Sequence, residues 1–142
     1  MLQLLNNSES KTLEFKASFG REVIETLTAF ANAKGGTVVI GVQDNKTVVG
    51  TEVGAETIQK WINQVKSTTS PQIIPDAEII DKDGRKLVFL SVQPYPVKPV
   101  SCRGRYFIRK GAANHVMSLG EIAEEHLKAI NLSWDYSIDP RH

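Results

Sequence analysis

Apolar residues recur along the chain at two spacings, and these spacings predict the secondary structure. A spacing of three and four residues places the apolar side chains of residues 20–33 on one face, which is typical of an amphipathic helix. Ser18 is the predicted N-cap of this helix, and Asn32 with the Gly35-Gly36 pair is predicted to end it, because glycine tolerates the left-handed conformation found there. The same spacing predicts two further helices, over residues 56–66 and 118–130.

Alternation of apolar and polar residues predicts the strands. In residues 12–16, Leu13 and Phe15 are expected to face inward. Residues 37–42 form an almost unbroken β-branched run, which is typical of a strand covered on both faces. Further strands are predicted over residues 47–49, 76–80 and 86–92, and as two short strands bent at Gly104 within residues 100–110. This order of elements predicts an α+β domain with a mixed β-sheet and about three packed helices.

The bulk properties limit the function classes open to the chain. We expect the domain over residues 1–130, followed by a tail or a linker to a further domain over residues 131–142. The net charge is +1, so nucleic-acid binding would need a local basic patch. Cys102 is the only cysteine, which excludes an internal disulfide and a cysteine-cluster zinc site. No apolar run approaches the ~20 residues of a membrane span, and no signal pattern opens the chain, so we expect a cytoplasmic protein.

Three carboxylates form the first candidate site. Glu14 lies on a predicted strand and Asp44 follows another, so the two approach each other if those strands are neighbours. Carboxylates without cysteine or histidine suit Mg²⁺ or Mn²⁺. Glu9 lies five residues before Glu14, and in one extended strand the two would face opposite ways; they converge only if the chain bends around Ser10 and Lys11. The alternative is that all three are solvated acids, with Asp44 a turn former.

A basic and aromatic stretch over residues 98–115 forms the second candidate site. It contains no acidic residue, and Tyr106 and Phe107 lie between its charges. Its basic side chains are Lys98, Arg103, Arg105, Arg109 and Lys110. On a strand, Arg105 and Arg109 would share a face with Phe107. Such a patch can bind phosphates by charge and by guanidinium geometry; the alternative is an edge strand protected against aggregation by its charges.

These residues resemble the Schlafen-type AlbA-like domain, a family of DNA-binding domains. The likeness covers roughly residues 9–130 and is carried by three blocks in order. They are Glu9-Ser-Lys-Thr-Leu-Glu-Phe-Lys16, Ala29-Phe-Ala-Asn-Ala-Lys-Gly-Gly-Thr-Val-Val-Ile-Gly-Val-Gln-Asp44 and Gly104-Arg-Tyr-Phe-Ile-Arg-Lys-Gly111. In bacterial relatives the domain looks like the N-terminal module of transcriptional regulators. The resemblance therefore implies nucleic-acid binding that requires no cofactor. The residues expected to contact phosphates are Lys16, Arg103, Arg105, Arg109 and Lys110.

The resemblance also implies a second function. In animal Schlafen proteins a similar core cleaves tRNA and rRNA with three metal-binding carboxylates, and Glu9, Glu14 and Asp44 match those positions. The chain would then be an endoribonuclease that depends on Mg²⁺ or Mn²⁺. The animal core is a fused pair of lobes with a zinc site, whereas this chain has one lobe and one cysteine, so a homodimer would have to rebuild the groove. A protein-interaction module without a nucleic-acid role is the third alternative.

Overall fold

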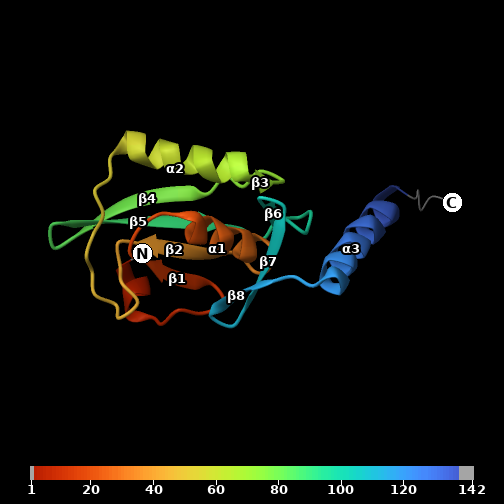
Figure 1. Ribbon diagram of the computed structural model, residues 1–142, viewed down its shortest axis with the longest axis horizontal. Coiled ribbons are helices and arrows are strands. Elements are labelled where there is room, and N and C mark those ends of the chain that lie inside the picture. Colours follow the sequence, from red (N-terminus) through yellow and green to blue (C-terminus); the bar gives the residue numbers. More distant parts are fainter. Residues whose placement is uncertain (1, 138–142) are drawn as a thin grey trace.

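The computed structural model describes residues 2–137, which form two four-stranded sheets on either side of a helix (Figure 1). The helices are the 3₁₀ helix η1 (Leu2–Asn6), α1 (Arg21–Ala31), α2 (Ala55–Thr68) and α3 (Leu119–Ser137). The strands are β1 (Leu13–Lys16), β2 (Gly36–Ile40), β3 (Thr69–Ser70), β4 (Asp76–Lys82), β5 (Arg85–Val92), β6 (Ser101–Cys102), β7 (Arg105–Lys110) and β8 (Ala113–Val116). The predicted α+β class is confirmed.

The first sheet is mixed, and β2 lies inside it. Its order is β1-β2-β5-β4; β1 is parallel to β2, and the other pairs are antiparallel. Val38 and Ile40 pack with α1 in one apolar cluster, while Val39 packs on the opposite face with Phe15 and the η1 residue Leu4. The prediction that this strand is covered on both faces is therefore confirmed.

Helix α1 is buried almost all round because the second sheet covers its other side. That sheet is antiparallel, with the order β3-β6-β7-β8, and β7 makes the most extensive contact with α1. The predicted apolar face of the helix is buried, and so are Thr26 and Thr28. Their hydroxyls donate to the carbonyls of Glu22 and Ile24, each at 2.8 Å, so burial leaves neither hydroxyl unpaired.

The β4–β5 hairpin is longer than predicted because it closes on a two-residue turn. Asp83 and Gly84 have φ values of 52° and 80°, the left-handed pair of a type I′ turn. Ladder pairing therefore continues to Lys82 and Arg85. The same turn chemistry recurs at Gly104, which is described with the site below.

Three sequence predictions differ from the structure. Ser18 is not the N-cap: the extended backbone of Gly20 takes that position, two residues later. The predicted strand over residues 47–49 is reduced to one bridge, Val42 to Val48, because the N–H of Thr47 bonds the side chain of Asn45. The last helix continues past residue 130 to Ser137. Within the described residues, no helix is long and apolar enough to cross a membrane.

Candidate functional site

Glu9 and Glu14 lie side by side because the chain turns back between them. The N–H of Ser10 donates to the carbonyl of Leu13 at 2.9 Å and closes a tight turn before β1. This turn lets Glu9 Oε2 accept a hydrogen bond from the N–H of Phe15 at 3.1 Å. The two carboxyl groups are also hydrogen-bonded to each other. The predicted condition for their convergence, a bend at Ser10, is met.

Arg109 holds this turn from inside the protein. Its side chain is completely buried, and Nη1 donates to Glu14 Oε1 at 2.9 Å and to Asn114 Oδ1 at 2.8 Å. Nε and Nη2 both donate to the carbonyl of Ser10, at 3.0 and 2.8 Å, and Nη2 also donates to the carbonyl of Leu13 at 3.1 Å. A guanidinium has five N–H groups, so this one has no donor left for a phosphate. The structure therefore corrects the expectation that Arg109 lies on the phosphate-binding surface.

The Glu9–Glu14 contact shifts the pKa values of the two carboxyl groups in opposite directions. Burial, and then the hydrogen bond with Glu9, raise the pKa of Glu14 to about 7 against the opposing effect of Arg109. Burial alone would raise the pKa of Glu9 too, but hydrogen bonds from Glu14 and from the N–H of Phe15 lower it. Glu14 is therefore the member of the pair that holds a proton more readily. Two adjacent carboxyls behave this way because both cannot ionise cheaply in a buried site.

Asp44 does not join this pair. It lies in the exposed turn after β2, where it lines a hollow of about 400 Å³ with Ala17 and Asn45. Among the residues that the structure describes, no three His, Cys, Asp or Glu side chains are grouped so that they could hold a metal ion. In this arrangement Glu9, Glu14 and Asp44 do not fit one shared Mg²⁺ or Mn²⁺.

Lys16, at the end of β1, is surrounded by acidic side chains. Its ammonium pairs with Glu22 at 2.8 Å, at a hollow of about 550 Å³ by the start of α1 that Glu25 also lines. Burial alone would lower the pKa of Lys16, but the hydrogen bond with Glu22 and the charges of Glu14 and Asp44 raise it. Lys16 therefore interacts electrostatically with both Glu14 and Asp44.

The end of the β6–β7 hairpin presents two exposed arginines. Arg103 and Gly104 have φ values of 50° and 78° and form a two-residue turn of the type I′ kind. Arg105 is exposed, with its guanidinium 5.6 Å from the centre of the Phe107 ring. Among the described residues, no acidic side chain forms an ion pair with Arg103 or Arg105.

The two faces of β7 have different surroundings. Phe107 and Arg109 point to α1 and are buried. Tyr106, Ile108 and Lys110 take the opposite, outer face, because side chains alternate along a strand. Lys110 remains more than half exposed and pairs with Glu121 of α3 at 3.0 Å. The predicted division of β7 into two faces is confirmed.

Asn32 and Asn114 are structural residues that the sequence pattern did not single out for this role. The Asn32 amide donates to the carbonyls of Val100 and Phe107 at 2.9 and 2.8 Å, and its oxygen accepts from the N–H of Val100 at 2.6 Å. Asn114 connects Arg109 to the hydroxyl of Thr26. The one available signal for Asn32 was a polar residue in the apolar run that ends α1; for Asn114 there was none.

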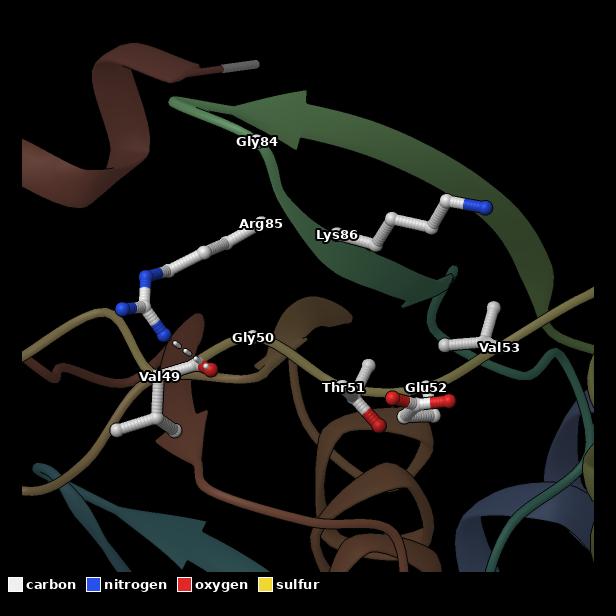
Figure 2. Close-up of a pocket in the computed structure, with 8 residues that line it drawn as sticks. All are labelled: Val49, Gly50, Thr51, Glu52, Val53, Gly84, Arg85 and Lys86. Carbon is white, nitrogen blue, oxygen red and sulfur yellow. Dashed lines mark hydrogen bonds between the residues drawn. The ribbon is translucent and has the colours of Figure 1, made fainter.

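Another hollow, of about 380 Å³, lies at the turn of the β4–β5 hairpin (Figure 2). Figure 1 shows this turn at the opposite end of the molecule from β6 and β7. The hollow is formed by residues 49–53 and the end of the β4–β5 hairpin. Figure 2 shows the Arg85 guanidinium turned to the carbonyl of Val49, to which it donates at 3.1 Å. Glu52 and Lys86 also line it. It contains no residue predicted for the site, and its charges are mixed.

Comparisons with known proteins agree with this fold. A family model described as Schlafen, AlbA_2 matches residues 9–118. No curated protein matches the chain. The DIP2311 protein from Corynebacterium diphtheriae superposes with a TM-score of 0.64 and 16% sequence identity. The match covers 84% of this chain but only 24% of the Corynebacterium chain. The N-terminal domain of a protein related to the ATP-dependent DNA helicase RecG, from Nitrosomonas europaea, gives a TM-score of 0.60 and 21% identity over 82% of this chain and 88% of that one. At such identities the two structures support the fold alone.

Proposed function

The chain belongs to the Schlafen AlbA_2 family, and on this premise we propose that it is a nucleic-acid-binding domain that contacts the phosphate backbone through its β6–β7 hairpin. The exposed end of that hairpin supports this proposal most directly. It presents Arg103 and Arg105 with no carboxylate paired to either among the described residues, and Lys110 lies further along the same strand. Arginine binds phosphate through a planar fork of donors.

The surroundings of the hairpin also support nucleic acid as the partner. A net charge of +1 leaves the molecule as a whole nearly neutral, so the attraction for a polyanion has to come from this one region. Among the described ion pairs, Glu121 neutralises part of the Lys110 charge, and no carboxylate is paired with Arg103 or Arg105. Arg109 takes no part in binding and instead holds β7 in place from inside.

The proposal is tested by the salt dependence of binding. Fluorescence anisotropy with a labelled duplex and a labelled structured RNA, from about 50 to 300 mM salt, should show affinity that falls steeply with salt. The double variant Arg103→Ala/Arg105→Ala should weaken binding to every sequence. It should also reduce the slope of log K against log salt by up to about two, because each lost phosphate contact contributes about 0.9.

A second double variant controls for net charge. Lys82→Ala/Arg85→Ala removes the same two positive charges from the opposite end of the molecule. It should leave affinity and salt slope near those of the unmodified protein. If both double variants weaken binding equally, or if neither nucleic acid binds, the hairpin does not have the proposed role, and a protein-interaction module becomes the better explanation.

Cleavage remains the alternative function, and the contact between Glu9 and Glu14 favours it. Asp44 lies apart from them, so the nuclease would need a rearrangement that brings a third ligand to the pair. Incubating tRNA with Mg²⁺ or Mn²⁺ and comparing the unmodified protein with Glu14→Gln separates the two functions. Binding without cleavage is the result we expect, and cleavage that is lost in the variant would overturn it.

We further propose that the domain works as a module of a larger transcriptional regulator in the cytoplasm. Its match to only 24% of the Corynebacterium chain supports a modular arrangement. A homodimer that rebuilds a two-lobed groove belongs to the same proposal. Light scattering coupled to size exclusion, with and without nucleic acid, tests that dimer by its mass.

A further inference from the structure

A hollow of about 450 Å³ lies between α3 and the outer face of the second sheet. Figure 1 shows α3 standing off from the body beyond β6–β8, to which it is joined by the segment after β8. The floor of the hollow is a row across three strands, because Ser70 pairs with Ser101 and Ser101 pairs with Tyr106. Lys98 and the α3 residue His126 also line it.

The chemistry of this hollow differs from that of the three hollows described above. Each of those is lined by at least one carboxylate: Asp44 in the hollow after β2, Glu22 and Glu25 in the hollow at the start of α1, and Glu52 in the hollow at the end of the β4–β5 hairpin. The described lining of this hollow contains no acid. It does contain an aromatic ring, a lysine, a histidine and apolar side chains such as Ile130. Its volume is within the range of about 300–1,000 Å³ found for small-ligand sites. A flat, partly apolar group attached to a negative charge fits this combination.

We propose that the hollow receives one unpaired nucleobase, stacked against Tyr106, of a strand whose phosphates lie along the basic hairpin. Tyr106 pairs with Ser101, beside the pair that closes on the Arg103–Gly104 turn, so its ring lies close to the end of the hairpin that carries Arg103. Lys98 lines the same hollow and supplies a second positive charge, whereas Arg105 points to the opposite face of β7. Stacking on an aromatic side chain accepts any base, since every base has a π-face. The inference rests on the proposed function and specifies the substrate class of the same surface.

The site would therefore select among nucleic acids by strandedness. A base inside a regular duplex is stacked between its neighbours and must be unstacked before it can enter a pocket, which lowers the affinity for duplex. Single strands, bulges and loops expose their bases without that cost. Tyr106 thus favours single-stranded or looped nucleic acid over a uniform duplex, while Arg103 and Arg105 attract both.

The experiment compares Tyr106→Ala with Tyr106→Phe on a single strand of about 12 nucleotides, which spans one binding site, and on a blunt duplex of the same sequence. Loss of one stacked base is worth roughly 1–3 kcal/mol, so Tyr106→Ala should raise the Kd for the single strand by about 5- to 150-fold. Binding to the duplex should stay within about twofold. Tyr106→Phe should retain the single-strand affinity, because it keeps the ring. If Tyr106→Ala fails to fold, Tyr106→Leu serves, since it keeps an apolar side chain but has no π-face.

A mononucleotide titration tests the hollow without the hairpin. Adenosine and uridine 5′-monophosphate, added to the unmodified protein, should shift the NMR signals of the Tyr106 ring and the His126 imidazole in a saturable way. Equal losses for both strands with Tyr106→Ala, or no loss for either, would overturn the base site while leaving the proposed function intact. Absence of binding to any oligonucleotide would overturn both.

Discussion

Arg105 and Arg109 lie four residues apart on the same face of β7, yet their surroundings are opposite. Arg105 is exposed at the end of the hairpin, near the Phe107 ring, and forms no ion pair with an acid among the described residues. Arg109 is completely buried, makes five hydrogen bonds and lies 5.0 Å from the centre of the Phe30 ring. The same residue type is therefore a structural group at one position and, in the proposed function, a phosphate-binding group at the other.

The difference shows how a charged stretch is divided between surface and core. The face that carries both arginines runs from solvent into the interface with α1, so only its first charge stays outside. The second arrives where the Ser10 turn presents two backbone carbonyls and the Glu14 carboxylate as acceptors. A buried charge is tolerated when it is paired and fully hydrogen-bonded, and Arg109 meets both conditions.

The largest expected effect on stability comes from replacing Arg109, the buried one of the two arginines. Arg109→Ala leaves the buried Glu9–Glu14 pair without its cation, and it removes the guanidinium donors from two backbone carbonyls. Removing one partner of a buried pair typically costs about 3–5 kcal/mol, so urea unfolding should show a loss of that size. Arg109→Lys should recover only part of it, because an ammonium has three donors instead of five.

The matched control for this prediction is Arg105→Ala. Arg105 is exposed, has no described ion pair, and its described side-chain contact is with the Phe107 ring, so its loss should change the free energy of unfolding by no more than about 1 kcal/mol, while the affinity for nucleic acid falls. The two arginines would then be separated by two independent measurements. Equal destabilisation by both variants would contradict the assignment of one to the core and the other to the surface.

A smaller effect is expected from the pH dependence of stability. The pKa of Glu14 is about 7 in the folded protein, against an ordinary value of 4.5 for a glutamate. Between these values the folded state keeps a proton that the unfolded chain releases, so stability from Glu14 is complete below pH 4.5 and is lost as pH rises towards 7. Glu9, with its lowered pKa, acts with the opposite sign at lower pH. Glu14→Gln should remove the loss, which we expect to be on the order of 1–2 kcal/mol.

Unfolding free energies measured from about pH 5 to about pH 8 test this. The unmodified protein and Glu14→Gln should agree most closely at the acidic end, and the unmodified protein should lose stability relative to the variant towards the alkaline end. Glu78→Gln, at an exposed position of β4, serves as the control and should track the unmodified protein throughout. Parallel curves for all three proteins would mean that the Glu9–Glu14 pair holds no extra proton.

The sequence was sufficient for the fold class and for most of the elements because their patterns are local, but it did not predict that the strands divide into two sheets. The β-branched run of β2 and the helical spacing of Val23, Leu27 and Phe30 each predict their own element, and burial confirms all of them. The hairpins were also predictable, although their extent depends on residues such as Asp83 and Arg103 adopting positive φ.

The site was less predictable because its contacts join distant parts of the chain. Arg109 lies 95 residues from Glu14, and no periodicity reveals that the two meet. Whether Glu9 faces Glu14 depends on one turn at Ser10, and whether Asp44 joins them depends on the path of a loop. The residue types of the candidate site were therefore predictable, but their division between core and surface required the structure.

The smallest expected effect concerns Lys110, an exposed cation of β7 whose charge is partly neutralised by Glu121 at 3.0 Å. Glu121→Gln should keep the capping interaction with Ser118, because glutamine also serves at that position. Removing the carboxylate frees the Lys110 charge, so affinity for nucleic acid at low salt should rise by about twofold and the gain should disappear at high salt. Glu125→Gln is the control: it removes the same charge from α3, but its nearest described cation is Lys128 at 3.9 Å. If both variants raise affinity equally, the gain reflects net charge alone and Lys110 makes no contact of its own.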